Sequence, residues 1–211
     1  MNRQDDTAAA AATSAGDRRR RLVASRALKL FARLGFDKVS LQDISKATGV
    51  PRTALYRYYR TKRDIFDGSI SGVLGEIRER INETLASGAP VPDRLVAVCD
   101  LVVESLFAQR DFLQAIFNFA FAMVKTGEDM TGRVTAFTGG LVRAFRRLLA
   151  EGVGDGSIRG TVDPEVGAEL LFALMESQAF NILLELEKNS SAARRRFRAA
   201  VANFSAQGRA P

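Results

Sequence analysis

Residues 18–63 combine a strong positive charge with the apolar spacing of three short helices. This segment contains 14 Lys and Arg side chains and two acidic ones, Asp37 and Asp43. Residues 64–211, in contrast, contain 16 basic and 19 acidic side chains. A small basic helical segment attracts polyanions such as nucleic acid, and the charge asymmetry indicates that the rest of the chain has another task. The alternative is a basic surface that merely keeps the protein soluble.

Helical periodicity and glycine signals divide residues 18–63. One apolar face recurs at helical spacing up to Gly35, which ends the first helix. Ser40 and Asp43 form a capping box that opens a second helix, and Gly49 ends it with a left-handed turn. The members of the first apolar face are Val23, Ala27, Leu30, Phe31 and Leu34.

Pro51 suits the first turn of a third helix, which we expect to run through Tyr59. Leu55 and Tyr59 are four residues apart and therefore face inward. Two short helices joined by a glycine turn form a helix-turn-helix unit, whose second helix enters the major groove of DNA. The opposite side of this helix presents Arg52, Thr53, Tyr56 and Arg57.

The sequence from Phe31 to Lys62 resembles the N-terminal domain of TetR-family transcriptional regulators. The resemblance rests on Phe31-Ala32-x-x-Gly35-Phe36, on Ser40-Leu41-x-Asp43-Ile44, and on Gly49-Val50-x-x-x-x-Leu55-Tyr56-x-Tyr58-Tyr59-x-x-Lys62. Pro51 and Ala54 depart from the family pattern, which usually has a serine and a threonine there, and they remove two possible polar contacts with DNA. The resemblance therefore supports the fold more directly than any single base contact.

We expect Arg52, Thr53 and Tyr56 to contact base edges, with Arg52 the best candidate for a bidentate contact to guanine. The resemblance implies phosphate contacts by Ser40, Arg57, Tyr58 and Lys62, whose side chains all offer hydrogen-bond donors. Arg18 and Arg19, in a run of four arginines, are expected to reach neighbouring phosphates or the minor groove.

The helical pattern continues to the end of the chain and predicts an all-α protein with about nine helices and no strand. A second capping box, Thr61 with Asp64, opens a long helix to about Ser87. We expect a disordered tail over 1–17, a helix-turn-helix domain over 18–63 and a ligand-binding and dimerisation domain over 64–211. The later helices are predicted at Asp93–Ala108, Phe112–Thr126, Glu128–Gly152, Asp163–Lys188 and Ser191–Ala206.

Beyond Lys62 the resemblance is weaker, although residues 155–165 look like the turn before the penultimate helix of the family. It implies that Asp163–Lys188 and Ser191–Ala206 pair with their copies in a homodimer. The alternative is that these faces pack only inside the monomer. The apolar faces expected to take part are Leu170, Leu171, Leu174, Phe180, Leu183 and Leu184, and then Phe197, Val201 and Phe204.

The middle helices are rich in aromatic and flexible apolar side chains with polar groups among them, a composition typical of ligand sites. Phe117, Phe119 and Phe121 cannot share one helical face, so at least one should point to solvent, a partner or a cavity. Glu176 lies in an otherwise apolar stretch and is expected to pair with a buried arginine or a cationic ligand. The resemblance implies a small lipophilic ligand, and the candidate residues are Phe117, Asn118, Phe121, Phe137, Met175 and Glu176.

The composition also disfavours several classes of protein. The chain has no histidine and one cysteine, Cys99, so we expect no metal, no cofactor and no catalytic residues. The N-terminus lacks a signal peptide, and the apolar stretch Phe112–Val124 is too short to span a bilayer, so we expect a cytoplasmic protein without a membrane segment. The glycines Gly68, Gly72 and Gly75 fall inside a helical pattern and favour close packing more than bending.

These observations favour a ligand-responsive transcriptional repressor that binds a palindromic operator in double-stranded DNA as a homodimer. Two alternatives remain at this stage. One is a constitutive or architectural DNA-binding protein whose body only dimerises, and the other is an all-helical enzyme with a DNA-binding appendage.

Overall fold

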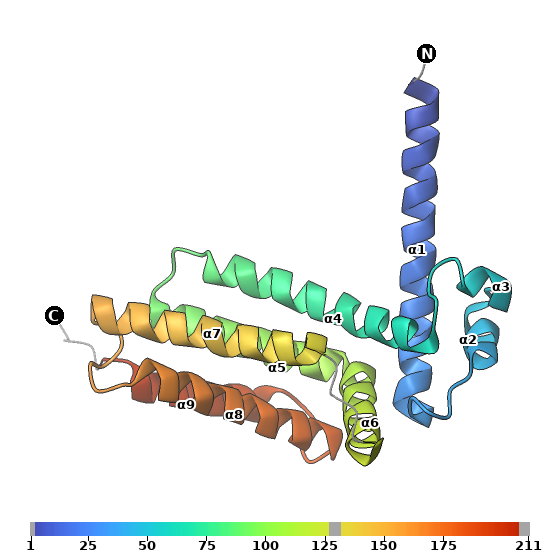
Figure 1. Cartoon of the computed structure of the whole chain (residues 1–211). Coiled ribbons are helices and arrows are strands. Elements are labelled where there is room, and N and C mark those ends of the chain that lie inside the picture. Colours follow the sequence, from blue (N-terminus) through green and yellow to red (C-terminus); the bar gives the residue numbers. More distant parts are fainter. Residues whose placement is uncertain (1–2, 127–131, 207–211) are drawn as a thin grey trace. The chain divides into compact units, whose positions relative to one another are not determined.

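The structure is a computed structural model that describes residues 3–126 and 132–206, with side chains at 15–122 and 136–206. Nine helices account for its secondary structure, so the predicted all-α class is confirmed (Figure 1). They are α1 (Arg3–Leu34), α2 (Leu41–Thr48), α3 (Arg52–Leu55), α4 (Lys62–Leu85), α5 (Val91–Ala108), α6 (Arg110–Thr126), α7 (Gly132–Asp155), α8 (Pro164–Leu183) and α9 (Ser191–Phe204). The predicted start of α7 at Glu128 lies outside the described residues.

The helices form two compact units. The first unit comprises residues 3–73 and 114–126, and the second unit comprises residues 74–113 and 132–206. The division therefore falls inside α4, whereas the sequence suggested a boundary at residues 63 and 64. The first unit also includes most of α6, a helix distant in sequence from α1, α2, α3 and the start of α4.

Aromatic side chains explain why α6 belongs to the first unit. The ring of Phe119 on α6 stacks on Phe66 of α4, with centroids 4.3 Å apart. It also meets Phe36 edge to face at 5.1 Å, and Phe31 of α1 contacts both Phe36 and Phe66. Aromatic pairs at these separations add to the stabilisation from buried area. The first unit is therefore organised around four aromatic rings from three helices and one loop.

Helix α1 begins at Arg3 and so includes most of the segment for which we expected a disordered tail. Residues 3–17 lack bulky apolar groups, which is why we expected them to be disordered. Alanine has the highest intrinsic helix propensity, and extending a helix that is already nucleated by packing needs no new nucleation step. The alanine-rich segment therefore continues the helix that Val23 and Ala27 anchor in the core.

The second unit has a continuous apolar core in which α5, α7, α8 and α9 contact one another. Cys99 of α5 is buried in this core, and burial raises the pKa of its thiol. The predicted turn before α8 is confirmed, since Asp163 caps that helix by accepting a hydrogen bond from the Glu165 amide at 2.8 Å. Fully buried members of the core are Leu95, Phe145, Leu149, Ile158, Leu171 and Phe197.

Helix α8 ends at Leu183, five residues before the predicted end at Lys188. The amide of Leu186 donates to the carbonyl of Asn181, and the amide of Glu185 donates to that of Ile182. This is the Schellman pattern of helix termination, with Glu185 in the left-handed position at φ 55°. That position usually holds glycine, so no residue near Leu183 indicated this helix end.

Helix α8 is also the one helix among the described residues that is long and apolar enough to cross a membrane by length and composition. Its mean hydropathy is 1.2, and 39% of the tested window is buried inside the structure. Core helices of soluble proteins share this length and composition, and Glu169 and Glu176 divide α8 into shorter uncharged stretches.

The three glycines of α4 differ in their surroundings. A Cβ atom at Gly68 would lie 2.7 Å from Cε1 of Tyr59, whereas no atom lies within 4 Å of such a Cβ at Gly72 or Gly75. Tyr59 is buried, and its hydroxyl donates to the carbonyl of Arg20 at 3.2 Å. Close packing, the interpretation favoured from sequence for all three glycines, therefore holds at Gly68 alone.

We predict that Gly68→Ala lowers the free energy of unfolding by about 1–3 kcal/mol, because the anchored Tyr59 ring must move to accommodate the methyl group. Gly72→Ala is the matched control, since it should be neutral or stabilise the helix by up to about 1 kcal/mol. Urea unfolding of both variants measures the difference. Equal shifts at the two positions would contradict close packing at Gly68.

Candidate nucleic-acid interface

The α2 helix starts with a complete capping box. The Asp43 amide donates to Ser40 Oγ at 3.2 Å, and the Ser40 amide donates to Asp43 Oδ2 at 2.9 Å. The Ser40 hydroxyl also donates to Asp43 Oδ2, and these hydrogen bonds from Ser40 hold the pKa of Asp43 below its ordinary value. The Ser40 hydroxyl, predicted as a phosphate contact, is thus already used in capping the helix.

The turn between α2 and α3 depends on Gly49. This residue adopts the left-handed conformation expected from sequence, with φ 69° and ψ 9°. Its amide donates to the carbonyl of Ser45 at 2.9 Å, and the Ser45 hydroxyl donates to the carbonyl of Val50 at 2.8 Å. Ser45 and Gly49 therefore fix the angle at which α3 leaves α2.

Helix α3 is one turn long, from Arg52 to Leu55, whereas we expected it to run through Tyr59. The chain then tightens, because the amide of Arg57 bonds to the carbonyl of Ala54 and the amide of Tyr58 to that of Leu55. These are i to i+3 hydrogen bonds, which close turns more tightly than an α-helix.

Inward and outward side chains of this segment lie as predicted. Leu55 and Tyr59 are buried in the first unit. The side chains that we expected to contact bases or phosphates are exposed at Arg52, Thr53, Tyr56 and Arg57, and Tyr58 is half-buried. Three donors of different shape, Arg52 and Thr53 of α3 and Tyr56 at its C-cap, are therefore exposed on one short segment anchored by buried Leu55.

Two of the predicted phosphate contacts come from α1. Arg18 and Arg19 are exposed. The neighbouring Arg20 is held against the bundle, because its guanidinium lies over the Tyr59 ring, 5.2 Å from the centroid. Residues 18–36 include no acidic side chain, so the electrostatic attraction of this face for phosphate is not cancelled locally.

Lys62 has a structural role that the sequence did not show. Its Nζ donates to the carbonyl of Phe36 at 2.7 Å and lies 3.3 Å from the carbonyl of Asp37. The same ammonium lies 4.4 Å from the centroid of the Phe36 ring, and burial lowers its pKa. Lys62 thus joins the start of α4 to the loop before α2, whatever further contact it makes with phosphate.

Helix α6 is tied to the first unit by a second residue that the sequence assigned otherwise. The amide nitrogen of Asn118, a predicted ligand contact, donates to the carbonyl of Ala32 in α1 at 2.9 Å. Its amide oxygen accepts from Gln114 at 3.0 Å. Arg63 of α4 lies over the Phe119 ring at 4.6 Å and pairs with Asp67. Contacts between helices so distant in sequence cannot be predicted from neighbouring residues. The aromatic content of α6 was the one sequence feature consistent with them.

The other predicted ligand residues are distributed over both units. In the first unit, Phe117 and Phe121 form a tilted pair at 6.3 Å, and Phe121 is 58% exposed while Phe119 is buried. This confirms that the three phenylalanines do not share one face. In the second unit, Phe137 is half-buried and Met175 is buried.

Glu176 is exposed, so the expected pairing with a buried arginine is wrong. The polar group buried in α8 is instead Gln178, whose amide oxygen accepts from Arg196 of α9 at 2.7 Å. The helical turn places Glu176 and Gln178 on different faces, which the apolar composition around them did not reveal. Within the described residues, no group of three or more His, Cys, Asp or Glu side chains could hold a metal ion.

We predict that Lys62→Met lowers the free energy of unfolding by about 1–3 kcal/mol, because two loop carbonyls lose a charged donor. The matched control is Lys38→Met in the same loop, where the side chain is exposed. Thermal unfolding compares the two variants. If Lys62→Met were as stable as the control and lost only affinity for DNA, the role in the loop would be refuted.

Comparison with known proteins agrees with this arrangement. Residues 24–68 match the family model of bacterial regulatory proteins, tetR family. Two similar proteins are each 28% identical to this chain. One is the uncharacterized HTH-type transcriptional regulator YezE of Bacillus subtilis (strain 168), matched over 70% of this chain and 76% of that protein. The other is the HTH-type transcriptional repressor KstR2 of Rhodococcus jostii (strain RHA1), matched over 69% and 70%.

The fold likewise has close counterparts among solved structures. The fatty acid degradation regulator FadR from Bacillus halodurans superimposes with a TM-score of 0.74 at 16% identity, covering 87% of this chain and 94% of that one. The capped α2, the Gly49 turn, the exposed face of α3 and the match over residues 24–68 together lead to one conclusion. The chain is a member of the TetR family of DNA-binding transcriptional regulators.

Proposed function

We propose that the protein is a homodimeric repressor that binds a palindromic operator in the cytoplasm and leaves it when a small, largely apolar ligand binds. The observation that supports DNA recognition most directly is the exposed face of α3, with Arg52, Thr53 and Tyr56 held outward by buried Leu55. The similarity to a protein named as a repressor supports repression over activation. A constitutive architectural binder would need no such side chains for base recognition.

Contacts with bases and with phosphates have separate roles in this proposal. Arg52, Thr53 and Tyr56 contact base edges in the major groove and supply sequence preference. Arg57 and Tyr58 contact phosphates, as do Arg18 and Arg19 from α1. Ser40 and Lys62 orient the start of α2 and the loop before it. The Ser40 hydroxyl and the Lys62 ammonium already donate within the protein, so a phosphate contact by Lys62 uses a remaining N–H group.

We predict that Arg52→Ala relaxes the sequence preference at one position of each half-site by about 1–3 kcal/mol. Selection of bound duplexes from random oligonucleotides, performed with the wild type and the variant, measures this effect. Arg57→Ala is the comparison, because loss of a phosphate contact weakens binding to all sequences alike and lowers the salt slope by about 0.9 per contact. A wild-type selection without a palindrome would refute the proposed operator, and an unchanged preference in Arg52→Ala would refute the base contact.

The exposed face of α8 supports the homodimer. Val166, Leu170, Phe180 and the C-cap Leu184 are 52%, 53%, 45% and 62% exposed. Together with exposed Ala173 and Ser177 they recur at intervals of four and three, the spacing of a seam that packs against another helix. A monomer rarely exposes such a continuous apolar stripe. Of the other predicted interface residues, Leu171, Phe197 and Val201 are buried inside the second unit and so belong to its own core.

The ligand half of the proposal is supported by the aromatic side chains of α6 and α7 and by similarity to a regulator named for fatty acid degradation. Phe117 and Phe121 of the first unit remain proposed apolar contacts, while Asn118 of that unit is engaged with α1. Phe137 and Met175 belong to the second unit and stay predictions from sequence, and Glu176 is exposed. Repeating the operator-binding measurement with a series of straight-chain fatty acids and with neutral sterols tests this half. Unchanged affinity for DNA with every compound would count against ligand control by this class.

We predict that Phe180→Glu converts the dimer to a monomer at micromolar concentration, because the carboxylate would have to be buried without a partner. Leu22→Glu on α1 is the control, since Leu22 is similarly exposed at 43% but lies outside α8. Sedimentation equilibrium measures the association of both variants. A dimer of undiminished affinity in Phe180→Glu would exclude the α8 face as the interface.

A further inference from the structure

Glu176 is an exposed charged residue of α8 whose position the fold of one subunit does not explain. It is exposed on α8 beside the apolar stripe, one turn before Phe180, and forms no ion pair in the described part of the chain. If a second copy covers the stripe, as proposed above, Glu176 lies at the edge of the covered area and loses part of its hydration. A carboxylate in that position needs a cation to offset the loss.

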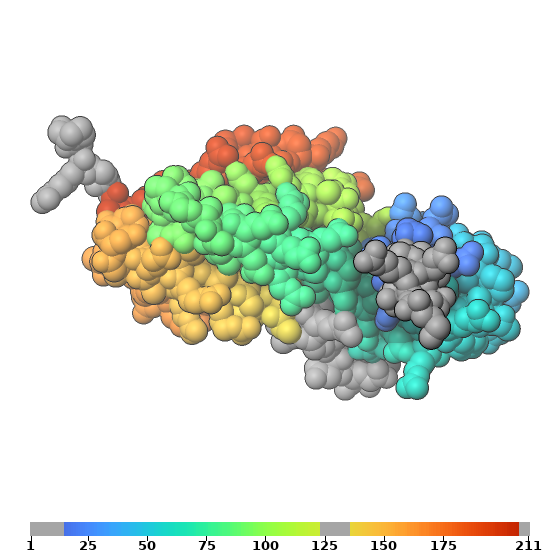
Figure 2. All heavy atoms as spheres, turned by 90° about the horizontal axis from the view of Figure 1, so that it is seen from above, coloured from blue at the N-terminus to red at the C-terminus, as the bar shows by residue number. Residues whose placement is uncertain are grey.

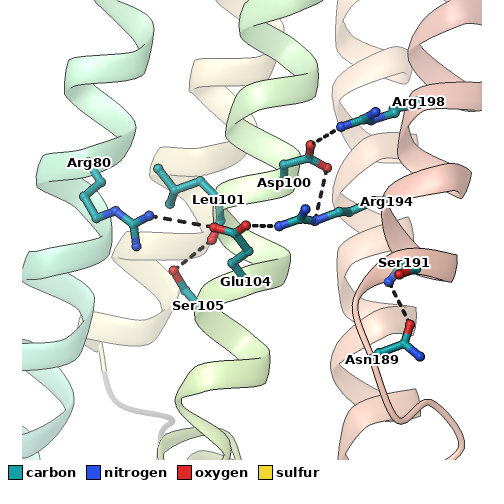
Figure 3. A network of polar contacts seen from close by, with 9 residues as sticks. All are labelled: Arg80, Asp100, Leu101, Glu104, Ser105, Asn189, Ser191, Arg194 and Arg198. Atoms are coloured by element: carbon teal, nitrogen blue, oxygen red, sulfur yellow. Dashed lines mark hydrogen bonds and ion pairs between the residues drawn. The ribbon is translucent and has the colours of Figure 1, made fainter.

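Helix α9 provides one exposed arginine that, like Glu176, has no ion-pair partner among the described residues. Arg194 pairs with Glu104 and Asp100 of α5, and Arg198 pairs with Asp100 at 2.8 Å (Figure 3). Arg196 pairs with Glu187 and contacts Gln178. Among the described residues, Arg195 alone of these four has no carboxylate partner, and its side chain is exposed.

The side chains next to Arg195 on the outer face of α9 are small, whereas those of the α8 stripe are bulky. Ala199 and Ala202 follow it at intervals of four and three and are exposed, so the outer face of α9 is a seam of small side chains with one arginine. The space-filling view shows α9, coloured red, at the surface of the second unit (Figure 2). Bulky side chains of one helix pack closely against small ones of another, and burying both stripes removes apolar area from water.

The two charges lie at nearly the same level of the α8 and α9 pair within one subunit. Within one subunit Arg196 reaches Gln178, so that neighbouring Arg195 and Glu176 occupy nearly the same level of the helix pair. They do not meet inside the subunit, because the contact of Arg196 with α8 turns Arg195 away from that helix. Both side chains are exposed, and a two-fold axis that passes near this level would bring each Glu176 close to Arg195 of the partner subunit.

We propose that Glu176 of each subunit forms an ion pair with Arg195 of the partner subunit, and that this pair determines which chains associate. The inference rests on the proposed homodimer. Because a two-fold interface is isologous, the pair occurs twice, and a single substitution perturbs both copies. Charge pairs at interfaces contribute chiefly to the choice of partner, since like charges placed opposite each other are strongly unfavourable.

The test uses charge reversal in the full chain. Glu176→Arg and Arg195→Glu should each raise the dimer dissociation constant at least about tenfold, because each places two pairs of like charges in contact. Mixing the two variants should restore association as a heterodimer, in which both contacts again join opposite charges. Native mass spectrometry of the mixture measures the heterodimer fraction, and sedimentation equilibrium measures the dissociation constants. Glu176→Gln, which removes attraction without adding repulsion, should give a smaller increase.

The control is Glu79→Arg, at an exposed glutamate of α4 outside the α8 stripe, which should change the dissociation constant by less than about threefold. A monomeric wild type would refute the homodimer itself. Binding of the α8 face to phosphatidylcholine vesicles, detected as co-sedimentation of the chain with the vesicles, would refute it as well. A dimeric wild type whose reversal variants dimerise normally would refute only the ion pair. So would a mixture that forms no heterodimer, or an Arg195→Glu variant that is rescued by Glu169→Arg instead of Glu176→Arg.

Discussion

The stacking of Phe119 on Phe66 determines what the DNA-binding part of this protein consists of. Without that contact, the first unit would consist of three helices and the start of α4. That is close to the domain predicted over residues 18–63. With it, a segment of α6 enters the same compact unit, and the hydrogen bond from Asn118 to the Ala32 carbonyl fixes its height along α1. Phe36 connects this cluster to Lys62, so the loop before α2 shares the same support.

That support gives the exposed face of α3 its rigidity. Helix α3 is a single turn and would not persist alone, since short helices are marginal in water. It is held by Leu55 and Tyr59 on its inner side, by the Gly49 turn at its start and by the Tyr59 hydroxyl on α1. Side chains that must match the edges of base pairs benefit from such seating, because ordering them on the DNA then costs less free energy.

Local features were predictable from sequence because each depends on residues close together in the chain. The capping box at Ser40 and Asp43 and the left-handed Gly49 follow from short-range chemistry, and both were found where expected. Errors arose where distant residues decide the outcome. Nothing near Asn118 indicates that its amide bonds to α1, and nothing near Lys62 indicates two carbonyl partners in another loop. The end of α8 was missed because Glu185 occupies a position where glycine is the usual signal. For Glu176, only packing could show which face of α8 it occupies.

The single sulfhydryl has a consequence for oxidative chemistry. Cys99 is enclosed by the core of the second unit, which disfavours its ionised form, and the thiolate is the species that attacks peroxides and electrophilic reagents. The chain contains no other cysteine. The native protein accordingly offers oxidants no accessible thiolate, and a cysteine engineered onto any solvent-facing helix would be its sole reactive thiol for attaching a fluorescent or spin label.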